Sequence, residues 1–288
     1  QIGKAIMSLL VTGSIGIDTV ESPAGKAVDA LGGSCVYFAY AASFFTPVRL
    51  VGVVGEDCPR GFLDPLARTG RIDLSGVEVR KGSKTFRWHG RYHDDVNVRD
   101  TVAVELNVLA ERGPAIPETF RDSTHVFLAN THPALQGELI GQLSSPALIV
   151  ADTMDLWIET QCDALLALLP QIDGLVLNDS EAKLLTGKSN VVAAGLEIAR
   201  QVRRFVVVKK GEHGSLLFAE SRVCALPSYP TVNVVDPTGA GDSFAGAMMG
   251  CLAATGRCDL PALREALAYG TVTASIGLEG FSLGRFLA

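Results

Sequence analysis

The sequence predicts an α/β fold: a three-layer arrangement in which a mostly parallel central sheet lies between helices on both faces, with a small β-sheet beside it. Two observations support this prediction. Short, almost entirely apolar segments alternate with longer segments of helical spacing, and one polar, aromatic stretch interrupts the alternation. The chain has 288 residues, of which 48% are hydrophobic and 19% charged, so it can bury a sizeable core.

The apolar segments are expected to be strands buried on both faces, as is typical of parallel sheets. They cover residues 8–13, 48–55, 124–130, 147–152, 174–178 and 205–211. The periodic segments are expected to be helices over residues 33–45, 60–69, 133–143, 156–169, 180–185 and 191–203. Alternation of strand and helix implies right-handed crossovers within a single domain over residues 1–288.

The interrupting stretch, KTFRWHGRYHDDVNVRDTVAVELN (84–107), is polar, aromatic and roughly alternating. This pattern predicts antiparallel strands half exposed to solvent. We expect a lid formed by about residues 17–30 and 79–107, although an ordinary edge hairpin has the same pattern. A small sheet exposes its edges, so homodimerisation through the lid is a further expectation.

Composition excludes several classes of protein. A net charge of −6 argues against binding to nucleic acid or to an acidic membrane surface. No apolar run reaches the roughly 18 residues of a membrane span, and the N-terminal stretch is expected to be a strand and turn, with Met7 as the natural start. The six cysteines are scattered without zinc spacing, which indicates reduced thiols and a cytoplasmic protein.

The stretch NVVDPTGAGDSFAG (233–246) places flexible backbone directly before an acid at the start of a helix. Residues 231–235 have the composition of a strand. The amides of Gly239, Ala240 and Gly241 would then form an anion site at a helix N-terminus, with Asp242 beside it. An anion site next to a carboxylate suits phosphoryl transfer to a hydroxyl, but an acid at this position can also be only a helix cap.

The chain resembles the ribokinase-like, or PfkB, carbohydrate kinase family in four ordered motifs. They are GGSCVYFAYAASFFTPVRLVGVVGED (32–57), LNDSEAKLLTG (177–187), KKGEHGSLLF (209–218) and DPTGAGDSFAGAMMG (236–250). The last departs from the usual D-T-x-G-A-G-D at Pro237. Neither a G-x-x-x-x-G-K-[ST] loop nor a G-x-G-x-x-G after the first strand is present, which argues against other nucleotide-binding folds.

The resemblance implies an ATP-dependent kinase with a defined catalytic end. Asp242 would be the base, and Gly239, Ala240 and Gly241 would hold the transferring phosphoryl group. Asn178 and Glu181 would order Mg²⁺ through its waters; the alternative is a helix cap with a first-turn acid. The other nucleotide-binding residues implied are Lys209, Gly211, Gly214 and Thr238.

Asp236 would help to hold a monovalent cation such as K⁺, or it is only a turn acid before proline. The resemblance also implies a substrate site. Its residues would be Asp18, Gly32, Gly33, Tyr37, Trp88 and Arg99. Asp18 would accept two sugar hydroxyls, and the double glycine would let the sugar approach the backbone.

Two departures from ribokinase concern the sugar. Gly16 and Tyr37 both stand where ribokinase-like kinases commonly have an asparagine. We therefore expect a substrate larger or less polar than ribose. The function predicted is an ATP-dependent kinase acting on a hydroxyl of a sugar or sugar-like molecule. The alternatives are a nucleoside kinase of the same family and a non-catalytic nucleotide- or sugar-binding protein.

Overall fold

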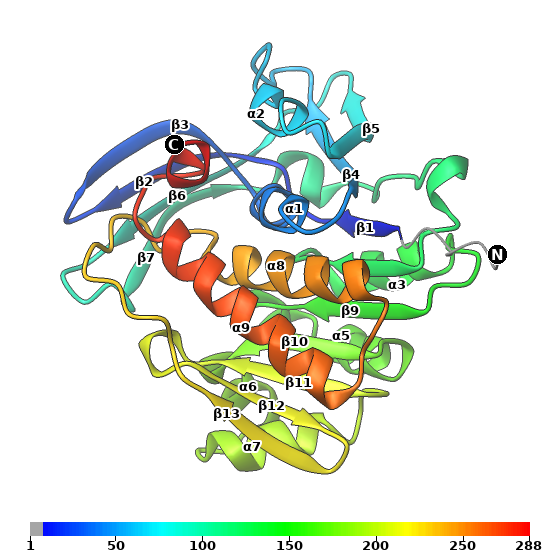
Figure 1. Cartoon of the computed structure of the whole chain (residues 1–288). Coiled ribbons are helices and arrows are strands. Elements are labelled where there is room, and N and C mark those ends of the chain that lie inside the picture. Colours follow the sequence, from blue (N-terminus) through cyan, green and yellow to red (C-terminus); the bar gives the residue numbers. More distant parts are fainter. Residues whose placement is uncertain (1–7) are drawn as a thin grey trace.

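The computed structural model describes residues 8–288, so Met7 lies outside the described residues. Its main sheet has nine strands in the order β13-β12-β11-β10-β9-β8-β1-β4-β5 (Figure 1). The strands are β1 (Leu9–Thr12), β4 (Val48–Gly55), β5 (Ile72–Arg80), β8 (His125–Leu128), β9 (Leu148–Asp152), β10 (Gly174–Asn178), β11 (Phe205–Lys209), β12 (Ser215–Ala219) and β13 (Arg222–Leu226). All neighbours pair in parallel except β11–β12 and β12–β13.

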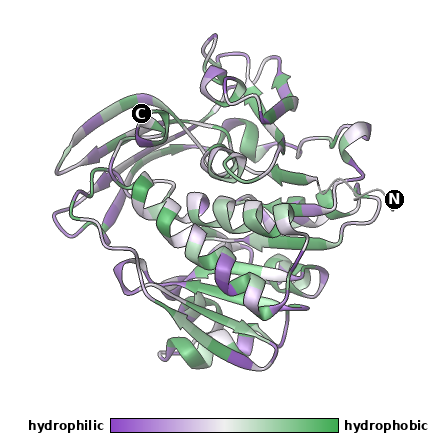
Figure 2. Ribbon diagram, viewed as in Figure 1, coloured by the Kyte–Doolittle hydropathy of each residue, from purple (hydrophilic) through white to green (hydrophobic). Residues whose placement is uncertain are grey.

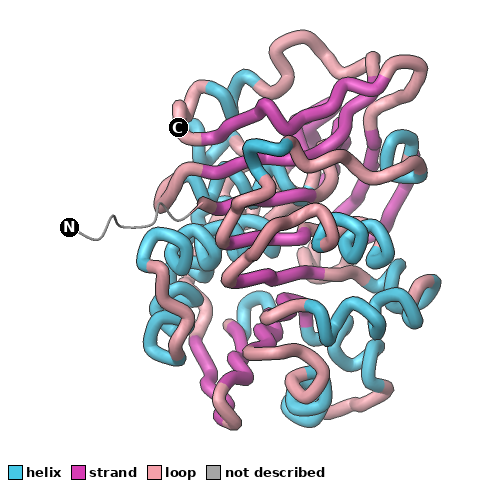
Figure 3. Tube along the Cα trace, turned by 90° about the vertical axis from the view of Figure 1, so that its right-hand side faces the viewer, coloured by secondary structure: helices cyan, strands magenta, loops and turns pink. Residues whose placement is uncertain are grey.

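Helices cover both faces of this sheet, as the side view shows (Figure 3). They are α1 (Ser34–Ser43), α2 (Asp64–Ala67), α3 (Pro133–Ile140), α4 (Asp155–Thr160), α5 (Cys162–Leu168), α6 (Asp179–Thr186), α7 (Val191–Ile198), α8 (Ala240–Thr255), α9 (Leu260–Gly277) and α10 (Gly284–Leu287). One core packs between the sheet and α1, α8 and α9, and a second between the sheet and α3, α5, α6 and α7. The predicted three-layer fold is confirmed, and the most apolar ribbons lie at its centre (Figure 2).

The expectation of a strand over residues 231–235 is wrong. The amides of Val235 and Asp236 both donate to Leu278 O at the end of α9, at 2.7 and 3.1 Å, instead of joining a sheet. Val232 is 96% exposed. None of residues 231–235 is buried, so these β-branched side chains have no apolar layer to pack against. A high β propensity alone does not make a strand.

Two predicted helices differ most from the structure. Of residues 60–69 only α2 is α-helical, because Gly61 has a positive φ of 73° and opens a turn. The helix expected over residues 156–169 is divided at Gln161, whose φ of −136° is not helical. Strands β5, β12 and β13 were not predicted. β5 and β13 are partly exposed and lack a continuous apolar run, whereas β12 is buried throughout and follows β11 after a short turn.

A second, small sheet has the order β3-β2-β6-β7. Its strands are β2 (Gly16–Ser22), β3 (Gly25–Gly32), β6 (Phe86–Tyr92) and β7 (Arg99–Glu105). The expected antiparallel hairpin within 84–107 is formed by β6 and β7, whereas β2 and β6 pair in parallel. Within the described part of the chain, no helix combines the length and apolarity that a membrane crossing requires.

Glycines let α1 and α8 come unusually close together. A Cβ built on Gly246 in α8 would lie 2.3 Å from the carbonyl oxygen of Phe38 in α1. This backbone contact fixes the distance between the two helices. Both helices carry residues of the site described below. By contrast, a Cβ on Gly137 in α3 would have no atom within 4 Å.

We therefore expect opposite effects from the same substitution in these two helices. Gly246→Ala should lower the free energy of unfolding by about 1–3 kcal/mol, since α1 and α8 must move apart. Gly137→Ala should raise it by up to about 1 kcal/mol through helix propensity. Urea unfolding followed by circular dichroism measures both, and equal effects would contradict the close contact.

Candidate active site

The parallel strands of the main sheet bring the site residues to one edge. β9, β10 and β11 are neighbours, and their carboxyl ends are Asp152, Asn178 and Lys209. Ligands of open α/β sheets bind outside such strand ends. The N-terminus of α8 lies at the same edge. A Cβ built on Gly241 would be only 2.6 Å from Lys209 Nζ.

Gly239 begins α8 in a conformation that requires glycine. Its φ is 76°, in the left-handed region, and a Cβ there would lie 2.3 Å from Cγ of Tyr37. The ring of Tyr37, which is 3% exposed, therefore packs directly against the glycine. The atoms nearest to that position are Cγ, Cδ1 and Cδ2 of the Tyr37 ring.

Two of the three expected anion-binding amides are free. The amide of Ala240 donates to Pro237 O at 3.2 Å, so it closes the turn before the helix. Among the described residues, no hydrogen-bond acceptor is found for the amides of Gly239 and Gly241. These two donors, the helix dipole and Lys209 together make a site for an anion.

Asp242 lies in the first turn of α8, next to this anion site. Burial raises the pKa of its carboxyl to about 6, while the Lys209 ammonium opposes that shift. Such a carboxyl is ionised at neutral pH yet more basic than an exposed aspartate. It can therefore accept a proton from a hydroxyl group that approaches the anion site.

Sequence reasoning missed Asp152, at the end of β9. It is 5% exposed, and its Oδ1 has no hydrogen-bond partner among the described residues. Burial, with a further contribution from Asp242, raises its pKa well above the usual range, whereas Lys209 lowers it. The only signal in the sequence was its position as the last residue of an apolar segment.

Asn178 and Glu181 form a capping box at the start of α6. Asn178 Oδ1 accepts from the amide of Glu181 at 2.8 Å, and Glu181 Oε2 accepts from the amide of Asn178 at 2.7 Å. The cap that was the alternative interpretation is therefore present. It does not exclude a second use, since burial raises the pKa of Glu181 and Lys209 is close enough to oppose that shift.

Asp18, in β2, has an unusual environment for a carboxylate. It is 4% exposed, and its Oδ1 has no hydrogen-bond partner among the described residues. A Cβ on Gly32 would lie 1.9 Å from Asp18 Oδ2. Gly32 thus makes room for this carboxylate. Gly33 has a φ of 102° where the chain passes close to Ser14 O.

Asp236 is buried and already has hydrogen-bond donors. Its Oδ1 accepts from the amide of Thr238 at 2.8 Å and its Oδ2 from that of Ser282 at 3.3 Å. This is the turn role that was one of the two interpretations. The hydroxyl of Thr238 donates to Tyr92 OH at 3.2 Å, so Thr238 faces the small sheet.

One face of the small sheet, the inner face, carries Asp18. In the β2–β6 register Asp18 lies beside Trp88, and in the β6–β7 register Trp88 lies opposite Val104. Paired residues point to the same side of a sheet, so these three side chains are neighbours. The Arg99 guanidinium lies 5.5 Å from the Trp88 ring centroid. The expected substrate residues Asp18, Trp88 and Arg99 therefore share one surface.

Gly211 and Gly214 form the turn between β11 and β12. Both have positive φ, 53° and 79°, and the Lys210 amide donates to Gly214 O at 2.8 Å. A Cβ on Gly211 would lie 3.4 Å from Asn97 Oδ1, in the loop between β6 and β7. This turn therefore lies beside Lys209 and under the end of the small sheet.

Comparison with known proteins agrees with this geometry. Residues 144–284 match the model of the pfkB family carbohydrate kinases. A cytidine kinase from Thermococcus kodakarensis is 30% identical over 251 residues, which cover 85% of this chain and 88% of that protein. The chain belongs to the pfkB carbohydrate kinase family. It is thus a kinase of the sugar and nucleoside class, as the resemblance implied.

Solved structures share the fold of this pfkB-family kinase at low identity. An adenosine kinase from Sinorhizobium meliloti has a TM-score of 0.80 at 18% identity, over 96% of this chain and 95% of its own. A structure from E. coli in complex with ATP and Mg²⁺ has a TM-score of 0.74 at 19% identity, over 95% of this chain and 93% of its own. At these identities the likeness concerns the fold.

Asp18 gives this kinase a testable pH dependence of stability. Burial, and then the carboxylates of Asp236 and Asp242, raise its pKa from 3.8 to about 7. Between these values the folded protein keeps a proton that the unfolded chain has lost, so the contribution of Asp18 to stability falls as pH rises.

Asp18→Asn should therefore raise the free energy of unfolding at pH 8, by on the order of 1–4 kcal/mol, and change it little at pH 4. Urea unfolding at both pH values measures the difference. Asp73→Asn, at an exposed position in β5, is the control. A stabilisation equal at both pH values would contradict the raised pKa.

Proposed function

We propose that this pfkB-family kinase transfers the γ-phosphoryl group of ATP to a sugar hydroxyl of a nucleoside, with Asp242 as the base. The observation that carries the proposal is the position of Asp242 in the first turn of α8. There it adjoins the free amides of Gly239 and Gly241 and the ammonium of Lys209. A proton acceptor and an anion site in contact are what phosphoryl transfer to an alcohol requires.

In the proposed reaction Asp242 accepts the proton of the substrate hydroxyl. The hydroxyl oxygen forms a bond to the γ-phosphorus while the bond from that phosphorus to the bridging oxygen of ADP breaks. The amides of Gly239 and Gly241 and the Lys209 ammonium stabilise the negative charge on the transferring group. The turn at Gly211 and Gly214 would bind the nucleotide beside them.

The inner face of the small sheet supports a nucleoside as the acceptor. Asp18 can accept hydrogen bonds from two neighbouring sugar hydroxyls, and its Oδ1 has no partner of its own within residues 8–288. Trp88 and Val104, beside it on the same face, offer apolar area to a base. The 30%-identical relative is a cytidine kinase, which also favours a nucleoside.

The residues at the strand ends fit a hydrated Mg²⁺. Asp152 has a buried oxygen without a partner in the described chain, and Glu181 faces the same lysine. Magnesium ions in proteins commonly keep several of their own waters. Asp152, Asn178 and Glu181 would hold such an ion. When bound, the ion would neutralise charge on the phosphates.

Replacing the proposed base tests the mechanism. Asp242→Asn should fold normally and bind ATP, but its kcat should fall by about 10²-fold or more, because a positioned base contributes on that scale. Asp163→Asn, which changes an exposed first-turn acid of α5, is the matched control. Near-normal turnover by Asp242→Asn would remove Asp242 from the mechanism.

A substrate panel tests the acceptor. We expect catalytic efficiency with at least one nucleoside, cytidine included, to exceed that with ribose by about tenfold or more. Trp88→Ala should lower the efficiency with nucleosides by about two- to tenfold and leave that with ribose unchanged, since an aromatic contact contributes about 0.5–1.5 kcal/mol. Trp88→Phe keeps an aromatic face and should retain most of the preference. A clear preference for ribose would overturn the nucleoside assignment.

A further inference from the structure

The loop that leads into α8 is attached to the small sheet at two points. Ser22 Oγ, at the end of β2, donates to Val235 O at 2.6 Å. Tyr92, at the end of the neighbouring strand β6, accepts from the Thr238 hydroxyl at 3.2 Å. Both bonds thus reach the four-residue segment Val235–Thr238, which immediately precedes Gly239.

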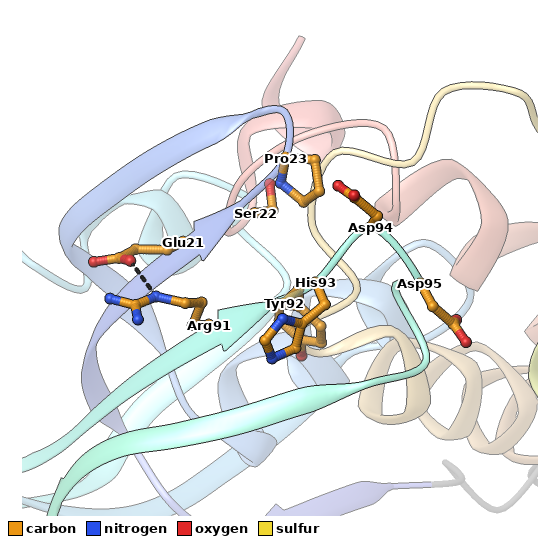
Figure 4. Close-up of a pocket in the computed structure, with 8 residues that line it drawn as sticks. All are labelled: Glu21, Ser22, Pro23, Arg91, Tyr92, His93, Asp94 and Asp95. Carbon is orange, nitrogen blue, oxygen red and sulfur yellow. Dashed lines mark hydrogen bonds and ion pairs between the residues drawn. The ribbon is translucent and has the colours of Figure 1, made fainter.

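Ser22 and Tyr92 are held side by side by the sheet. Glu21 and Arg91 are partners in the β2–β6 register, so Ser22 and Tyr92 occupy the next position of the two parallel strands. Figure 4 shows both at the strand ends, where they line an open cavity of about 480 Å³. Tyr92 is 8% exposed, so its hydroxyl is a fixed acceptor and not a freely solvated group.

Asp18 lies four residues before Ser22 on β2, and side chains an even number of residues apart on a strand point to the same face of the sheet. This face also carries Arg99, which is the cross-strand partner of Tyr92. If a bound substrate displaces this face, the two points at which the loop is attached, Ser22 and Tyr92, move with it. The loop is also attached to the segment after α9. Asp236 accepts from the Ser282 amide, and the Val235 amide donates to Leu278 O. The small sheet is therefore the second support of the loop.

We propose that Tyr92 and Ser22 are positioning residues through which the small sheet sets the placement of the free amides of Gly239 and Gly241. The inference rests on the proposed kinase function, since those amides are the proposed phosphoryl site. Acceptor binding on Asp18 and alignment of the anion site would then be coupled through two hydrogen bonds. Thr238 would belong to this coupling more than to nucleotide binding.

Kinetics of Tyr92→Phe, Thr238→Val and the double variant test the proposal, with ATP and the best acceptor of the panel. Each single variant should lower kcat by about two- to tenfold, the range of one hydrogen bond, with little change in KM for the acceptor. Because both remove the same bond, the double variant should lose no more than the larger single loss. Tyr40→Phe, which removes a hydroxyl bonded to Phe286 O at 3.4 Å, should leave kcat unchanged. Losses that multiply would overturn the proposal.

Hydrogen exchange provides a readout that does not depend on turnover. The amides of Ala240 and Ser243 donate to Pro237 O and Gly239 O at the start of α8. They should exchange faster in Tyr92→Phe and in Ser22→Ala than in the wild type, and Tyr40→Phe should not change them. Unchanged exchange in both variants would overturn the coupling even if the enzyme is an active kinase. Faster exchange without turnover on any acceptor would support the coupling while overturning the proposed function.

Discussion

The site depends on burying several carboxylates close to a single ammonium. Asp152, Glu181 and Asp242 all lie within the electrostatic influence of Lys209, and burial raises the pKa of each. Ionised groups are costly to bury unless they are paired. One lysine cannot pair with three acids, so the free protein holds a surplus of negative charge or of bound protons at this edge. A cationic ligand would remove that surplus.

A second set of acids lies next to the small sheet, where Asp18 and Asp236 are close to Asp242. Asp242 thus belongs to both sets, and its protonation depends on what occupies each side. Burial, and then repulsion by Asp236 and Asp242, raises the pKa of Asp18 to about 7, whereas Lys209 opposes the rise at Asp242 and leaves its pKa at about 6. Asp18, proposed to bind the substrate, and Asp242, proposed to accept its proton, are therefore electrostatically linked.

Much of the fold could be predicted from the sequence because buried parallel strands are continuous apolar segments. Two of the strands that were missed, Ile72–Arg80 and Arg222–Leu226, are partly exposed and have no such pattern. The segment 231–235 was mistaken for a strand because β-branched residues favour strands only where a neighbour is available. That neighbour depends on tertiary contacts, here the end of α9, which local composition does not contain.

The site divides in the same way. The motifs named Asp242 and Lys209 separately, and the structure brings both to one sheet edge, where the Lys209 ammonium lowers the pKa of Asp242. What could not be predicted were the contacts between distant segments. The closure of a turn by the Ala240 amide, the packing of Tyr37 on Gly239 and the bond from Thr238 to Tyr92 all depend on exact chain paths.

The capping box of Asn178 and Glu181 has a consequence for how this chain tolerates change. The side chains proposed to order a metal ion are the same ones that begin α6, and each uses one oxygen for the cap. Replacing a capping residue by alanine costs about 0.5–2 kcal/mol of stability, whatever happens to activity. Replacing Asn178 or Glu181 by alanine would therefore lower the stability of α6 and also remove a side chain of the proposed metal site. A substitution that removes the capping oxygen of either residue therefore affects both the start of α6 and the proposed metal site.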